Sequence, residues 1–211
     1  MEYTISNDEN IIKYYWDLQV DDQIDLLWNV NFNYFVYSKN SNIKIKFDTK
    51  WEAVTWNVFV ILYWKWNSFL DVIINIKHDN CKINVYIVSF LQDDNSISVN
   101  WNVIVDHNVN NSQWHLLEKN LILWKKVKVK ATPRLDVCSQ NVYATHGVSI
   151  NKFDPESLFY MWNKWLDVVS SQKLLVAWSI QGILKSFVDV PDVDKQKIQS
   201  KILSAITISN D

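Results

Sequence analysis

A series of short, strand-like runs dominates the chain between about residues 30 and 129. The stretch Ile43–Phe47 (IKIKF) alternates apolar and polar side chains, as a strand with one buried face must. Further runs rich in Val, Ile, Phe and Tyr follow, with a break every ten or so residues: Val58–Tyr63, Phe69–Ile76, Lys82–Leu91, Ile97–Asp106 and Leu121–Lys130. Many short strands of regular spacing predict a sandwich, a barrel or a β-solenoid, and the spacing alone does not choose among them.

The pattern becomes helical after Asp154. Asp154-Pro155-Glu156 is a strong helix start, with an N-cap carboxylate, a proline at the first helical position and an acid that the helix dipole favours. Three helices are expected, over Ser157–Lys164, Ser170–Val188 and Asp192–Ile206. The sequence therefore predicts a lead-in segment over residues 1–27, a β body over 28–150 and a C-terminal helical domain over 151–211.

Glycine is scarce and tryptophan abundant, with 2 glycines and 12 tryptophans in 211 residues. At an average usage of about 7%, a chain of this length holds about 15 glycines. A fold with many strands needs them where the backbone turns with positive φ. The tryptophans stand beside Asn, Lys, Ser and Asp at the edges of apolar runs, as in Tyr63–Ser68 and Asn100–Asn102, which we interpret as turns.

We therefore hypothesise that most or all tryptophans occupy positions where the natural protein has glycine. The sum of 2 and 12 is 14, close to the expected number. The simplest mechanism is an organism that reads UGA as glycine. One alternative is a genuinely Trp-rich carbohydrate-binding β module, which would expose its indoles in a row on one sheet face. Another is an enzyme on a β-helix, such as a polysaccharide lyase, although the acids here are dispersed.

The net charge and the absence of certain motifs exclude several classes of function. A net charge of −2 and a pI near 6.1 give no footprint for nucleic acid. No apolar run is long enough to span a bilayer, residues 1–10 show no signal peptide, and two cysteines make no disulfide framework, so a cytoplasmic setting is expected. The sequence contains no Gly-x-Ser-x-Gly, no His-Glu-x-x-His and no phosphate-binding loop, which predicts a protein that is not an enzyme.

Two neighbouring blocks carry a resemblance to a known family. Leu135–Ser149, with its Thr-His-Gly element, and Phe153–Tyr160 (FDPESLFY) resemble the C-terminal signature of the SufB/SufD iron–sulfur cluster assembly proteins. That signature joins a (Ser/Thr)-His-(Gly/Ala) element to an Asp-x-(Asp/Glu)-x-Leu-Phe-Tyr helix, which usually closes on Ser-Arg-Gly-(Leu/Ile). Asn163–Leu166 (NKWL) matches that closure if Trp165 stands for glycine. The similarity extends over about Thr55–Phe187.

The resemblance implies a right-handed parallel β-helix followed by a helical tail that docks the SufC ABC-type ATPase. Family members pair through their β-helices, SufB with SufD, and build a transient iron–sulfur cluster; no tightly bound cofactor is expected. Gly147 after the histidine is the SufD-like form, and Val127 stands near the position of the sulfur-accepting SufB cysteine. The expected function is a SufD-like scaffold subunit that pairs with a SufB-type partner or with a second copy.

Several residues are candidates for the site. His146 is the first candidate ligand for iron or a cluster, because neutral imidazole binds iron well; the alternative is a structural histidine bonded to backbone. Cys138, close to it in sequence, is a second candidate ligand or sulfur site. Cys81 is predicted to be a buried structural thiol. Four apolar residues of the first helix and its end are interpreted either as core or as contacts to the ATPase: Leu158, Phe159, Tyr160 and Leu166.

Overall fold

A computed structural model describes residues 2–5, 9–15, 20–26, 31–39, 42–64, 68–91, 96–122, 127–152, 155–185 and 191–205. The described strands are β1 (Glu2–Ile5), β2 (Glu9–Tyr15), β3 (Val20–Leu26), β4 (Asn31–Lys39), β5 (Asn42–Thr49), β6 (Thr55–Trp64), β7 (Ser68–Ile76), β8 (Lys82–Leu91), β9 (Ser96–Val105), β10 (Ser112–Ile122), β11 (Lys128–Val137) and β12 (Val142–Lys152). The described helices are α1 (Pro155–Trp162), α2 (Val168–Leu184) and α3 (Asp192–Ala205).

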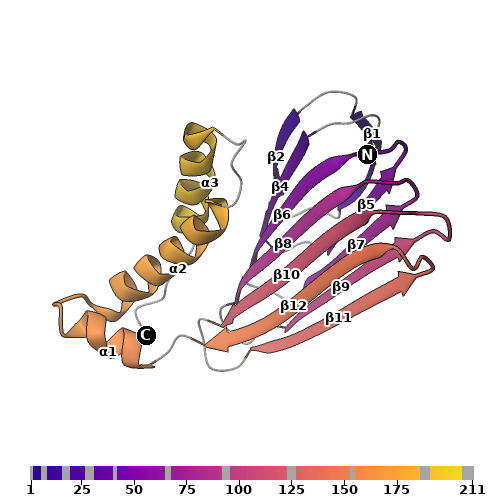
Figure 1. Ribbon diagram of the computed structural model, residues 1–211. Helices are drawn as coiled ribbons and strands as arrows, with labels where there is room; N and C mark the ends of the chain where they lie inside the picture. The colour runs from indigo at the N-terminus through magenta and orange to yellow at the C-terminus, as the bar shows by residue number, and fades with distance from the viewer. Residues whose placement is uncertain are drawn as a thin grey trace.

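The strands form two six-stranded parallel sheets between which the chain alternates (Figure 1). Odd-numbered strands make one sheet, in the order β1-β3-β5-β7-β9-β11, and even-numbered strands make the other, in the order β12-β10-β8-β6-β4-β2. Each strand thus pairs with the strand two further along the chain. This confirms the predicted mainly β fold, a β-solenoid with C-terminal helices. The stretch expected to be a lead-in contributes β1, β2 and β3 to the sheets.

The core lies between the two sheets. In β9, for example, every second side chain is buried, and the five that point inward are Ile97, Val99, Trp101, Val103 and Val105. Parallel register stacks them on inward residues of β7, as Leu70 lies beside Val99 and Ile74 beside Val103. Since each fully buried Val, Leu or Ile contributes about 1.5–3 kcal/mol, these columns of branched side chains are the main source of the fold's stability.

Stacked turns connect the sheets on one side of the solenoid. Ala53, Asn80 and Asn111 each adopt a positive φ, between 53° and 59°. The Ala53 N–H donates to the Asp79 carbonyl at 2.9 Å, and the Asn80 N–H donates to the Asn110 carbonyl at 3.0 Å. Asparagine tolerates this conformation better than most residues other than glycine, so these turns form with almost no glycine in the chain.

Three of the tryptophans whose side chains are described are buried in strands, and three are exposed: Trp51, Trp165 and Trp178. Trp56, Trp101 and Trp114 are at most 2% exposed and lie inside strands, so the turn predicted at Asn100–Asn102 is wrong. These buried indoles do not form the outward row that a carbohydrate-binding module would need. Trp165, by contrast, follows α1 with a φ of 64° and a side chain 96% exposed. That is a glycine-type conformation, and the proposed replacement of glycine by tryptophan stays a prediction.

The helices pack on one another beside the sheets (Figure 1). The buried face of α2 contains Val176, Ile180 and Leu184, and α3 contributes Ile198. The predicted cap Asp154 lies outside the described residues. Within the described helices, none combines the length and the apolar character that crossing a membrane requires.

Candidate functional site at the open end of the solenoid

The last strand of each sheet lies at the C-terminal end of the solenoid. In the described part of the chain, β11 pairs with β9 alone and β12 pairs with β10 alone (Figure 1). Their other edges therefore present unpaired backbone N–H and C=O groups, which are templates for another strand. We call this end of the molecule, formed by β11 and β12, the open end.

The inward face of the open end is apolar and uncovered. Val137, Val148 and Ile150 are 40%, 39% and 50% exposed. In register they lie against Val105, Glu118 and Asn120, all of which are 0% exposed. The inward side chains of the preceding strands, β9 and β10, are thus completely buried at these positions. Apolar side chains at core positions without cover are typical of an interaction surface.

His146 lies on this inward face. It is in register with Leu116, which is 1% exposed, whereas the histidine side chain is exposed. Its ring meets the Trp101 indole edge-on, with ring centroids 5.7 Å apart. The structure therefore places the first candidate ligand near the centre of β12, on the surface of the open end.

A chain of polar groups runs beneath His146. The Trp101 Nε1–H donates to Glu118 Oε2 at 3.1 Å, and Asn120 Nδ2 donates to Glu118 Oε1 at 2.7 Å. Ser89 Oγ donates in turn to Asn120 Oδ1. Glu118 is fully buried, and burial raises the pKa of its carboxyl group, against the opposing effect of the hydrogen bonds from Asn120 and Trp101.

Sequence reasoning missed Glu118 because it placed no strand between Asp106 and Leu121, whereas β10 covers Ser112–Ile122. Within that strand, the acid stands two residues after an inward leucine and two before an inward asparagine, so alternation places it inside. A buried carboxyl group in an apolar solenoid is uncommon and points to a specific role.

The two cysteines lie in different surroundings. Cys138 is exposed directly after β11, and its N–H donates to the Val105 carbonyl at 3.1 Å. Because His146 lies four residues into β12, it is about 13 Å along the strand from the turn that contains Cys138. The structure does not bring these two candidates together. Cys81 is buried, as predicted, and burial raises the pKa of its thiol.

Metal ligation by this chain alone is limited in the residues that the structure describes. There, no group of three or more His, Cys, Asp and Glu side chains is placed to hold a metal ion. An ion at the open end would therefore take few ligands from this chain and keep open coordination positions for water or for a partner's groups.

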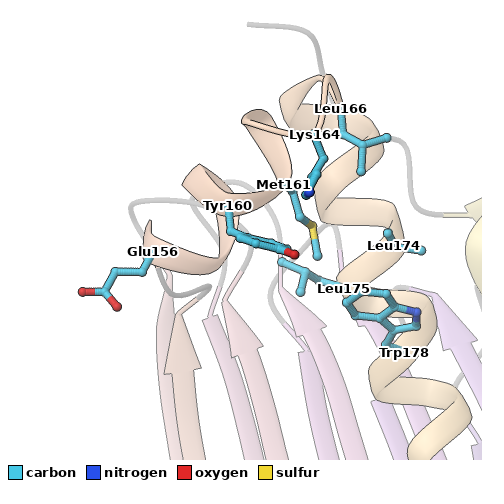
Figure 2. Close-up of a pocket in the computed structure, with 8 residues that line it drawn as sticks. All are labelled: Glu156, Tyr160, Met161, Lys164, Leu166, Leu174, Leu175 and Trp178. Atoms are coloured by element: carbon cyan, nitrogen blue, oxygen red, sulfur yellow. The ribbon is translucent and has the colours of Figure 1, made fainter.

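A second candidate surface lies on the helical tail. A groove of about 460 Å³ between α1 and α2 is lined mainly by apolar side chains, and Figure 2 shows Tyr160, Met161 and Trp178 gathered around it. Tyr160 and Trp178 are 64% and 55% exposed, and the Lys164 ammonium group lies 5.7 Å from the centre of the Tyr160 ring.

The four residues predicted to contact the ATPase lie in different surroundings. Phe159 and Tyr160 are exposed, and Leu166 is half-buried between this groove and a second hollow that Phe159 and Trp165 line. The side chain of Leu158 lies outside the described residues. Exposed Phe159 and Tyr160 therefore belong to the surface of the tail rather than to its core.

Comparisons with known proteins agree on one family. A family model described as "SUF system FeS cluster assembly, SufBD core domain" matches residues 32–177. An iron–sulfur cluster assembly SufBD family protein of Synechocystis sp. (strain ATCC 27184 / PCC 6803 / Kazusa) is 28% identical over 60 residues. That match covers 28% of this chain and 13% of the cyanobacterial protein, so the chain matches only a small part of the relative's length.

Proposed function

Because the chain belongs to the SufB/SufD family of SUF-system iron–sulfur cluster assembly proteins, we propose that it is a SufD-like scaffold subunit. The observation that carries the proposal is the open end, where the inward face of the last strands is apolar, uncovered and contains His146. The chain pairs there with a SufB-type partner or a second copy. It is not an enzyme, and ATP hydrolysis comes from the SufC-type ATPase.

The edge of β12 supports pairing at the open end. Protected edges usually carry proline or charged side chains, and β11 has Pro133 and Arg134. Residues 142–151 of β12 contain neither proline nor Asp, Glu, Lys or Arg. Since β12 lacks these protective features, a strand from a partner can extend its sheet while the partner covers Val148 and Ile150.

Gly147 supports the SufD-like assignment. A Cβ atom added at this position would lie 3.3 Å from Leu117 Cδ1, tighter than ordinary van der Waals contact. SufB proteins tend to carry an acidic residue here, so it is the glycine itself that favours the SufD-like form. The cargo is a transient iron–sulfur cluster, for which His146 is the proposed ligand.

The groove on the helical tail is the proposed docking site for the ATPase. Tyr160 and the neighbouring Phe159 are large apolar side chains exposed on this part of the tail, and rings of this kind dominate the energetics of protein interfaces. Lys164 and Glu156 beside them supply the polar rim that interfaces usually have.

Co-purification with the ATPase tests this function. The tagged chain is co-expressed with the ABC-type ATPase encoded nearest to its gene, and we expect the two to elute together. Tyr160→Ala and Phe159→Ala should each weaken the complex at least tenfold. Val193→Ala, a matched control 74% exposed on α3, should leave it unchanged. Retention of a glycan without any binding of the ATPase contradicts the proposal.

A further inference from the structure

A hollow of about 470 Å³ lies where four strands of the odd-numbered sheet begin. Its lining includes the first residues of β5, β7, β9 and β11, which are Asn42, Ser68, Ser96 and Lys128. These four strands are neighbours in the sheet (Figure 1). None of the residues that line this hollow lines the groove on the helical tail, so the two are separate surfaces.

One row of side chains crosses this hollow on the outer face of the sheet. In register, Lys130 lies beside Ser98, Ser98 lies beside Phe69, and Phe69 lies beside Asn42. With neighbouring strands about 4.8 Å apart, the row is about 14 Å long. An extended peptide advances about 3.3 Å per residue. The row is therefore as long as about four residues of an extended chain, and much longer than a single phosphate or carboxylate group.

Two lysines give one end of the row a positive charge. Lys128 and Lys130 are exposed and stand two residues apart on β11, so their side chains share a face of the strand. Among the residues that the structure describes, no carboxylate lies within 4.0 Å of either ammonium group, and no acid lines the hollow. In the sequence, Lys125 and Lys126 precede them, so four lysines fall within six residues.

We propose that the hollow binds an extended acidic segment of another protein, with its carboxylates over Lys128 and Lys130. Further along the row, the Ser98 hydroxyl and the Asn42 amide suit the backbone of such a segment, because each can donate and accept hydrogen bonds. Half-buried Phe69 between them offers apolar surface to one of its side chains. This binding goes beyond the proposed function, which places partners at the open end and on the helical tail.

Fluorescent peptides test the proposal, with anisotropy as the measure of their affinity for the full chain at constant ionic strength. We expect the peptide EEELL to bind at least tenfold more tightly than its uncharged counterpart QQQLL. Replacing both lysines, Lys128→Gln with Lys130→Gln, should weaken binding at least tenfold. Ser98→Leu, which fills the hollow without changing its charge, should weaken it at least threefold. Lys82→Gln, which removes an exposed lysine at the start of β8 in the other sheet, should not change it.

Equal binding of the two peptides overturns the inference, as does an affinity that the lysine replacements leave unchanged. If Ser98→Leu does not weaken binding, the lysines act as exposed charges on an edge strand rather than as part of a site, and the inference is wrong. Displacement of the peptide by micromolar inorganic phosphate would identify a small-anion site instead and would also overturn it. Circular dichroism establishes that each variant is folded; if Ser98→Leu is not, Ser98→Gln is judged by the same criterion.

Discussion

At the scale of single residues, Asp48, near the end of β5, is a buried charge with several partners. Its side chain is 3% exposed and accepts a hydrogen bond from Asn75 Nδ2. Lys46 Nζ lies 3.1 Å from Asp48 Oδ2, and the ammonium groups of Lys50 and Lys77 lie at 3.8 Å and 3.9 Å. Burial alone raises the pKa of Asp48, but the hydrogen bonds from Asn75 and Lys46 and the lysine charges together lower it.

The Asp48 carboxylate makes the unfolding free energy depend on pH. A carboxyl group with a lowered pKa in the folded state stabilises the protein above its unfolded-state pKa of about 3.9, and the contribution is lost as pH falls through the folded-state value. The unfolding free energy should therefore fall below about pH 4, and less steeply in Asp48→Asn. Urea unfolding between pH 7 and 3 measures both slopes, and parallel curves would show that Asp48 does not contribute.

At the scale of elements, the link between α1 and α2 depends on a backbone conformation that tryptophan disfavours. Trp165 has a φ of 64°, and Leu166 N–H reaches back to the Met161 carbonyl at 3.3 Å, as at a helix end closed by a left-handed residue. Asp167 then caps α2, since the Ser170 N–H donates to Asp167 Oδ1 at 2.8 Å. Glycine fits this helix end better than any residue with a Cβ atom.

Trp165→Gly should therefore stabilise the chain. A left-handed conformation costs a residue with a Cβ atom about 1–2 kcal/mol, while glycine adds about 0.4–1 kcal/mol of unfolded-state entropy. We expect a net gain of about 0.5–1 kcal/mol in unfolding free energy, measured by chemical denaturation. Ala177→Gly, inside α2, is the opposite control and should cost about 1 kcal/mol. A loss of stability in Trp165→Gly would contradict the interpretation of this site as a glycine position.

At the scale of the whole molecule, alternation predicted which residues face inward but not which strands meet. Ile43, Ile45 and Phe47 are all buried, as their spacing required. The pairing of β5 with β7 across the intervening β6 could not be predicted from spacing, because strand partners are set by contacts between distant residues. The prediction of a solenoid, in which such a pairing occurs, came instead from the family resemblance of Leu135–Ser149.

Part of the candidate site was also visible in the sequence. His146 was found from its motif, but its place on an uncovered face depends on where the solenoid stops, which no local pattern encodes. The position of Trp101 was missed because its asparagine neighbours resemble a turn, whereas the inward alternation of β9 outweighs them. Glu118 was missed because the strand that contains it, β10, was not predicted.

The central claim is that β11 and β12 end the solenoid in a pairing surface. Light scattering of the chain, alone and with a SufB-type partner, measures this directly through the mass in solution. We expect a dimer in at least one of these two samples. Ile150→Lys, on the inward face of β12, should reduce the dimer to monomers, whereas Tyr143→Lys, on the outer face of the same strand, should leave the dimer intact. A monomer in both mixtures, or a dimer that Ile150→Lys leaves intact, would contradict the account.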